Sequence, residues 1–333
     1  MHNNKINVFR ELSKNDTSML KGIFAIAVLV HHLYQHSKLF YGTPIGSILQ
    51  LLGFLSVSVF FFLSGYGLTV SYNNKGDKYI KDFPGNKLLP FYFYMTILII
   101  IYSLENLILG IPMDFSALIQ SFLFGKTVIN NGWYLQTTLF LYLIFYFALA
   151  FVKKDFLKKY AFFAGFAIYF FVCFFLDLSS YWYETVLAFA AGSVFACLFQ
   201  KNKIFEIKPF FAVIFTGILF IISTLLGHID FIPDFFGLIF RMFSNISFAV
   251  LVVLITITVP VRFAFFEKIG SISFEIYVSQ GLFLSLFHSN IIYVENQILY
   301  IFLTSISTFA FSVPLHSFFS KSTVFLKKSQ LKK

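Results

Sequence analysis

Charged residues are scarce in this chain of 333 residues: they form 12% of it, against 58% hydrophobic residues. A soluble domain of this length carries about twice that share of charge. The scarcity excludes an ordinary soluble fold and predicts an all-α, polytopic membrane protein. We expect one membrane domain over residues 1–333, with an embedded core at 18–319 and cytoplasmic tails at 1–17 and 320–333.

Cysteine is nearly absent as well. Both cysteines, Cys173 and Cys197, lie in apolar segments and lack the spacing of a metal site, and no HExxH pattern is present, so we expect no metal. The net charge of +10 does not predict nucleic-acid binding, because the basic residues are spread over loops between apolar segments. The first eighteen residues are polar and of mixed charge. The first apolar run therefore resembles a signal-anchor helix rather than a cleavable signal peptide.

Long apolar segments are what the sequence has instead. Ten of them are long enough to cross a membrane as helices. They cover Ser18–Tyr34, Ile48–Val70, Phe91–Leu109, Trp133–Val152, Tyr160–Leu176, Trp182–Phe199, Phe210–Leu226, Phe235–Val259, Ser271–Phe287 and Ile298–Phe319.

The positions of the basic residues support this count. If each segment crosses once and the N-terminus is cytoplasmic, all but three of the 25 basic residues fall at the cytoplasmic side; the exceptions are Lys38, Lys126 and Arg241. A missed helix would place every later loop on the wrong side of the membrane and mix the basic residues between the two sides. The observed concentration of basic residues on one side therefore predicts ten spans in the plasma membrane with both termini inside.

Under this topology several polar side chains share the outer half of the membrane. Ionisable groups at that depth are expensive and are functional candidates by default. The alternative for the charges is a structural ion pair of Arg241 with Glu105 or Glu184, and for the aromatic pair an interfacial belt. The group comprises His31, His32, Glu105, Glu184, Arg241, Trp133 and Tyr134.

The first span carries Lys21 and, eleven residues later, His32. Eleven helical steps return to within about 20° of the starting direction and cover about 16 Å, so both side chains lie on one face. His31 points about 100° away. His32 is a candidate general base. The alternatives are a structural histidine, or a metal ligand paired with His36 one turn further on.

Four further motifs follow in order: Phe61–Gly67 with Ser64 and Gly65, Asn86–Phe93 with Lys87, Gly132–Tyr146, and Gly270–Ser279. Together with Lys21, Gly22 and His32, they resemble the acyltransferase 3 family of integral-membrane acyltransferases. The resemblance covers nearly the whole chain, from Ser18 to about Phe319.

The resemblance implies transfer of an acyl group, usually acetyl from acetyl-CoA, to a hydroxyl of a carbohydrate or lipid-linked glycan at the cell surface. It assigns essential roles to Lys21 and His32, and matches Ser64 and Lys87 to family motif positions. Lys21 and Lys87 are expected to hold the anionic acyl-CoA. The candidates for stabilising the oxyanion are Ser64, Tyr134 and a water, and a transient acyl-histidine is the alternative to general-base catalysis by His32. Trp133, Tyr134, Glu105 and Arg241 are expected to bind the acceptor.

The chain departs from the usual family pattern at three positions: Lys21 replaces the more common Arg, Ser58 an Asp, and Gln280 a late histidine. A partner carboxylate at 58 or a second histidine at 280 is therefore absent. The main alternative function is a transporter or exporter of a glycan or small metabolite. Against it, the sequence has no paired broken spans related by an inverted repeat.

Overall fold

A computed structural model describes residues 9–200, 208–259 and 261–330. Over these residues the chain forms helices and no strand, with one isolated β-bridge between His288 and Tyr293. The predicted all-α class is confirmed. Parts of the expected tails, 1–8 and 331–333, lie outside the described residues, as do Lys201 and Lys203 of the charge pattern.

Among the described residues, nine helices are long and apolar enough to cross a membrane, and a bent helix pair supplies a possible tenth crossing. This agrees with the predicted count of about ten. The nine candidate spans are Lys14–Ser37, Pro44–Lys75, Pro84–Ile108, Trp133–Ala150, Asp155–Phe175, Ser180–Phe199, Pro209–Leu226, Asp234–Thr258 and Gln297–Lys327.

The ninth predicted span, Ser271–Phe287, differs from expectation because it is not one straight crossing. Helix α11 (Ala264–Ser271) and helix α12 (Ser273–Leu286) meet at an angle of 70°. Between them Ile272 leaves the helical region, with φ −115° and ψ 16°. Helix α12 alone rises about 21 Å, less than the hydrocarbon thickness of about 30 Å, so this crossing requires both helices.

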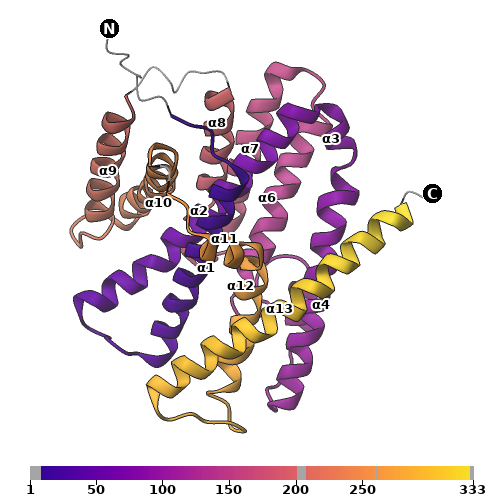
Figure 1. Cartoon of the computed structure of the whole chain (residues 1–333), viewed down its shortest axis with the longest axis vertical. Coiled ribbons are helices and arrows are strands. Elements are labelled where there is room, and N and C mark those ends of the chain that lie inside the picture. The colour runs from indigo at the N-terminus through magenta and orange to yellow at the C-terminus, as the bar shows by residue number, and fades with distance from the viewer. Residues whose placement is uncertain (1–8, 201–207, 260, 331–333) are drawn as a thin grey trace. The chain divides into compact units, whose positions relative to one another are not determined.

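The chain divides into two compact units, and three helices contribute to both. The first unit comprises Met1–Phe24, Phe54–Gly76 and Phe166–Ser271. Within it α10 packs along α9 and against α8, as Figure 1 shows for α9 and α10. Its helices are the first part of α1 (Lys14–Ser37), the later parts of α2 (Pro44–Lys75) and α7 (Asp155–Phe175), η2 (Ser180–Trp182), α8 (Leu187–Gln200), α9 (Pro209–Leu226), α10 (Asp234–Thr258) and α11.

The second unit comprises Ala25–Gly53, Asp77–Gly165 and Ile272–Lys333. Helix α12 packs along α13, and Leu29, Leu33, Leu284 and Tyr300 form a buried cluster. Besides the remaining parts of α1, α2 and α7, the unit holds α3 (Asp77–Lys81), η1 (Pro84–Leu88), α4 (Leu89–Ile108), α5 (Phe115–Gln120), α6 (Trp133–Ala150), α12 and α13 (Gln297–Gln330).

Helix α13 also extends further than expected. It passes through Pro314 and continues to Gln330, so residues 320–330, predicted as a tail, prolong the last helix.

Candidate functional site

The first helix begins with a capping box that sequence reasoning missed. The Ser13 hydroxyl accepts a hydrogen bond from the backbone N–H of Asp16 (3.2 Å), and the Asp16 carboxylate accepts one from the backbone N–H of Ser13 (2.8 Å). This reciprocal pair satisfies two backbone donors at a helix start. The spacing of Ser13 and Asp16 before an apolar run is the signal that would have revealed it.

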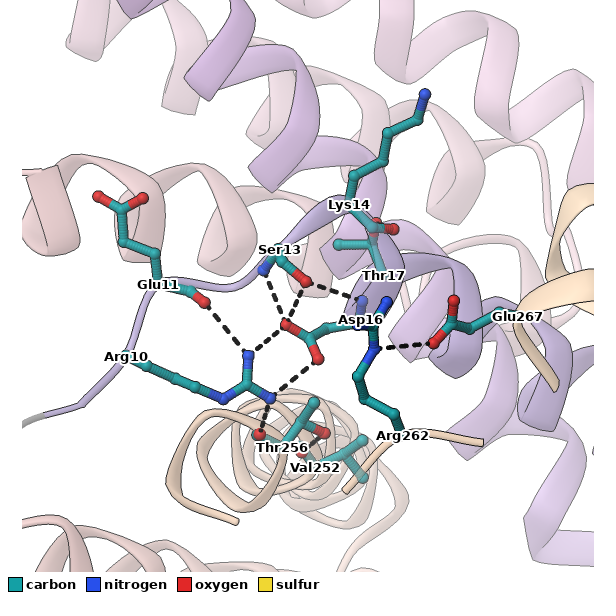
Figure 2. A network of polar contacts seen from close by, with 10 residues as sticks. All are labelled: Arg10, Glu11, Ser13, Lys14, Asp16, Thr17, Val252, Thr256, Arg262 and Glu267. Carbon is teal, nitrogen blue, oxygen red and sulfur yellow. Dashed lines mark hydrogen bonds and ion pairs between the residues drawn. The ribbon is translucent and has the colours of Figure 1, made fainter. Parts of the chain in front are cut away.

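Arg10 ties this helix start to the end of α10. Figure 2 shows its guanidinium between Asp16, which it contacts at 2.5 and 2.9 Å, and the carbonyl oxygen of Thr256, at 2.7 Å. The Thr256 carbonyl is one of the last in α10, where helix carbonyls lack partners within the helix. The hydrogen bond to Asp16 raises the pKa of Arg10 above its ordinary value, so the guanidinium stays charged in this contact.

Two glycines hold α1 against α11 at the level of Lys21. A Cβ on Gly22 would overlap the carbonyl oxygen of Phe266, and one on Gly270 would overlap that of Ser18. The backbones therefore meet without side chains between them. Gly22 of the first motif and Gly270 of the last motif therefore make this contact between the two helices. The half-buried Lys21 lies next to it.

Lys87, the second predicted cofactor-binding residue, is exposed on η1. Lys21 belongs to the first unit and Lys87 to the second. A shared binding site for both lysines therefore stays a prediction.

The two adjacent histidines of α1 have different surroundings. His31 is anchored: its Nδ1 lies 2.9 Å from the carbonyl oxygen of Leu49, and its ring fills the space beside Gly53. His32 is buried, with 7% exposed, and its Nδ1 makes no hydrogen bond to any described residue. A buried polar atom without a partner is uncommon in proteins and is often functional. His32 therefore differs from His31 in having an uncommitted ring nitrogen.

Helix α12 provides the polar neighbours of His32. The side-chain amide of Gln280 lies close to the His32 ring. Neither Oε1 of Gln280 nor Nδ1 of His32 makes a hydrogen bond within the described residues. The ring of Tyr277 lies 4.6 Å from that of Tyr134, and its hydroxyl donates to the carbonyl oxygen of Asn131 at 3.0 Å. Helix α12 thus contacts both predicted site elements, His32 on α1 and Tyr134 on α6.

Helix α4 approaches α12 from the side that bears Glu105. The Tyr102 hydroxyl donates to the carbonyl oxygen of Val278 at 2.8 Å, and it occupies the space where Gly281 lacks a side chain. Glu105 lies one turn after Tyr102 and is half-buried, with Oε1 unpaired among the described residues. Trp133 is half-buried, and its ring stands edge-on to that of Tyr134 at 6.3 Å.

Arg241 forms an ion pair in the first unit. Its Nε donates to the Glu184 carboxylate at 3.3 Å and its Nη1 to the carbonyl oxygen of Gly227 at 3.2 Å. Asn245 also donates to the backbone carbonyl of Glu184. These contacts correspond to the structural ion pair that was the alternative for Arg241. Glu105 lies in the other unit.

Ser64, half-buried on α2, stands beside a second close contact between backbones. A Cβ on Gly65 would overlap the carbonyl oxygen of Phe189, and one on Gly192 would overlap that of Phe62. Ser64 itself makes no hydrogen bond to another described residue. It belongs to the first unit, whereas His32 belongs to the second, so their joint action stays a prediction.

His36 has an aromatic partner. Its ring stacks on His288 at 6.3 Å, and His288 stacks on Tyr300 at 3.8 Å with 4° between the planes. No group of three or more His, Cys, Asp or Glu residues in the described part of the chain has a geometry suited to a metal ion.

The geometry can be compared with known proteins. A family model described as an acyltransferase domain, that of the acyltransferase 3 family, matches residues 17–317. The match extends from the start of α1 into α13. Neither the curated proteins nor the solved structures give a match.

Proposed function

The chain belongs to the acyltransferase 3 family and is an integral-membrane acyltransferase, and we propose that it moves an acetyl group from cytoplasmic acetyl-CoA to a hydroxyl of a cell-surface or lipid-linked polysaccharide. The observation that carries the proposal is the buried His32 with its unpaired ring nitrogen, next to Gln280. The buried imidazole supports the proposal because its Nε2 can accept a proton in a site shielded from water when Nδ1 carries the hydrogen.

In the proposed reaction His32 acts as general base. It takes the proton of the acceptor hydroxyl while that oxygen attacks the thioester carbonyl carbon. The tetrahedral intermediate collapses as the C–S bond breaks, and the imidazolium returns the proton to the leaving thiolate. The products are the acetyl ester and free coenzyme A, and His32 ends neutral. Ser64 is proposed to donate a hydrogen bond to the developing oxyanion.

The donor is proposed to enter from the side of the membrane at which α1 begins. Coenzyme A is polyanionic, and Lys21 and Lys87 supply positive charge for its phosphates. Because Lys21 and His32 lie about 16 Å apart along one helix, the extended pantetheine arm can connect a nucleotide near Lys21 to a thioester near His32.

The acceptor is proposed to meet His32 from the opposite side. Trp133 and Tyr134 present aromatic rings on which a sugar ring can stack, and Glu105 offers an unpaired carboxylate oxygen to its hydroxyls. Arg241, the remaining member of the proposed set, already donates hydrogen bonds to Glu184 and to the carbonyl oxygen of Gly227.

The first prediction concerns the base. His32→Ala should lower acetylation of the surface polysaccharide by about 10²–10⁴-fold, the usual contribution of a general base. Mass spectrometry of the polysaccharide from cells with equal amounts of inserted protein measures the acetyl mass. The matched control is His31→Ala, which should keep more activity because His31 is held by a backbone carbonyl. Wild-type acetylation in the His32 variant would remove the base assignment, and the reverse order of the two variants would transfer it to His31.

A further inference from the structure

We propose that Gln280 is the positioning residue of His32: its carbonyl oxygen accepts a hydrogen bond from Nδ1–H and thereby leaves the lone pair of Nε2 to act as base. The catalytic consequence rests on the proposed function. The contact itself does not, because it is a property of the folded chain.

The two side chains have complementary unpaired atoms. His32 is 7% exposed and Gln280 is 1% exposed, and Nδ1 of His32 and Oε1 of Gln280 are both buried without a hydrogen bond among the described residues. The Gln280 amide lies within reach of the His32 ring. Leaving two such atoms unpaired costs free energy that a small side-chain rotation into one shared hydrogen bond removes.

Packing of α1 on α12 holds the two side chains together. Leu29 and Leu33 on α1 form one buried cluster with Leu284 on α12. Gln280 lies one turn before Leu284, and His32 stands between the two leucines in sequence. The apolar cluster therefore keeps the parts of α1 and α12 that carry His32 and Gln280 close together.

A backbone contact determines which end of the amide faces the histidine. Nε2 of Gln280 donates to the carbonyl oxygen of Tyr277 at 3.1 Å. A carbonyl oxygen only accepts, so the amide cannot be flipped at this position without placing two acceptors against each other. The remaining group of Gln280 is its oxygen, an acceptor, and its natural partner is an N–H of the imidazole. The structure thus selects the tautomer with the proton on Nδ1.

A neutral partner suits a buried base. An aspartate in this place would favour the imidazolium and introduce a second buried charge, which is costly in the membrane interior. An amide orients the ring and sets its tautomer without adding charge. A catalytic base needs a neighbouring group that orients it. This chain has no carboxylate at position 58 and no histidine at position 280, and the amide of Gln280 takes that role.

The test uses three variants of the full-length protein in membranes. Gln280→Leu removes both polar groups at similar volume, and Gln280→Glu keeps the acceptor but adds charge. The matched control is Gln136→Leu. Gln136 is also 1% exposed, donates from Nε2 to a backbone carbonyl, that of Gln120, and leaves Oε1 unpaired among the described residues.

The kinetic readout is kcat and KM for acetyl transfer as a function of pH. Gln280→Leu should lower kcat about 10–100-fold, the usual effect of losing an orienting partner, with little change in KM for acetyl-CoA. Gln280→Glu should retain more activity and move the acid limb of the profile to higher pH, because a carboxylate stabilises the imidazolium. Gln136→Leu should leave both kcat and the pH of the acid limb of the profile close to the wild-type values.

A second readout needs no activity. In a double-mutant cycle of His32→Ala and Gln280→Leu, the shifts in thermal midpoint should be non-additive, whereas His32→Ala and Gln136→Leu should add. Additive shifts for the first pair, or equal falls in kcat for Gln280→Leu and Gln136→Leu, would overturn the proposal. If wild-type protein transfers no acetyl group, the proposed function fails while the thermal cycle still decides the contact.

Discussion

At the scale of single residues, the environment of each histidine separates its role from those of the others. His31 is fixed by the carbonyl of Leu49, His36 stacks on His288, and His32 keeps a buried ring nitrogen without a partner. All of them are imidazoles with the same intrinsic chemistry. The difference arises from which neighbours each ring meets, and it is the reason for proposing His32 rather than His31 or His36 as the base.

His288 allows a pH prediction at this scale. It lies in the loop between α12 and α13, and partial burial lowers its pKa below the ordinary value of 6.5. The unfolded chain therefore takes up a proton at this residue at higher pH than the folded chain does, so folding loses stability as pH falls below about 6.5. His288→Phe keeps a ring over Tyr300 but cannot be protonated.

The measurement is the thermal midpoint of both proteins between about pH 7.5 and pH 5. The midpoint of His288→Phe relative to wild type should rise as pH falls, because only the wild type suffers from protonation at 288. His36 stacks on His288, and the charges of the two rings repel each other, so the comparison reports the protonation of this coupled pair. A difference that stays constant over this range would contradict the assignment.

At the scale of elements, two pairs of glycines bring helix backbones into direct contact. Gly22 and Gly270 bring α1 against α11, and Gly65 and Gly192 bring α2 against α8. Small residues at such contacts let backbones approach closely, which is a main source of helix association in membranes. Packing thus explains Gly22, Gly65 and Gly270, one glycine in each of three motifs.

Two glycines of α2 provide a matched comparison. Gly65→Ala should lower the thermal midpoint and the amount of inserted protein, because its Cβ would overlap a backbone carbonyl that cannot move alone. Gly67→Ala should be neutral or stabilising by up to about 1 kcal/mol, since nothing lies within 4 Å of the added carbon and Ala favours helices. Thermal unfolding in detergent measures both. Equal effects of the two substitutions would show that α2 and α8 do not make this contact in the membrane.

At the scale of the whole molecule, the basic residues predict orientation. The positive-inside pattern puts the loop at Tyr41, before α2, outside and the last turn of α2, at Asn74, inside. Both side chains are exposed in the structure, so both positions are open to reagents. The proposed direction of the reaction, with the donor below His32 and the acceptor above it, depends on this orientation.

Labelling with a membrane-impermeant maleimide tests the orientation. In a background with Cys173 and Cys197 replaced by alanine, Tyr41→Cys should react in intact cells, and Asn74→Cys should react only after permeabilisation. The reversed pattern would invert the donor and acceptor sides. Equal labelling of both positions in intact cells would mean that α2 does not cross the membrane.

The sequence by itself determined the helical membrane class, the positions of most spans and the family, because long apolar runs and short ordered motifs are local properties of a chain. It placed Lys21 and His32 on one helix, since helical periodicity follows from spacing alone. The tertiary structure alone decided that the ninth span bends at Ile272, that Arg241 pairs with Glu184, and that Gln280 lies near His32 with its side-chain oxygen unpaired among the described residues. These facts depend on which distant helices pack together, and no local pattern encodes the partner that a buried polar atom will meet.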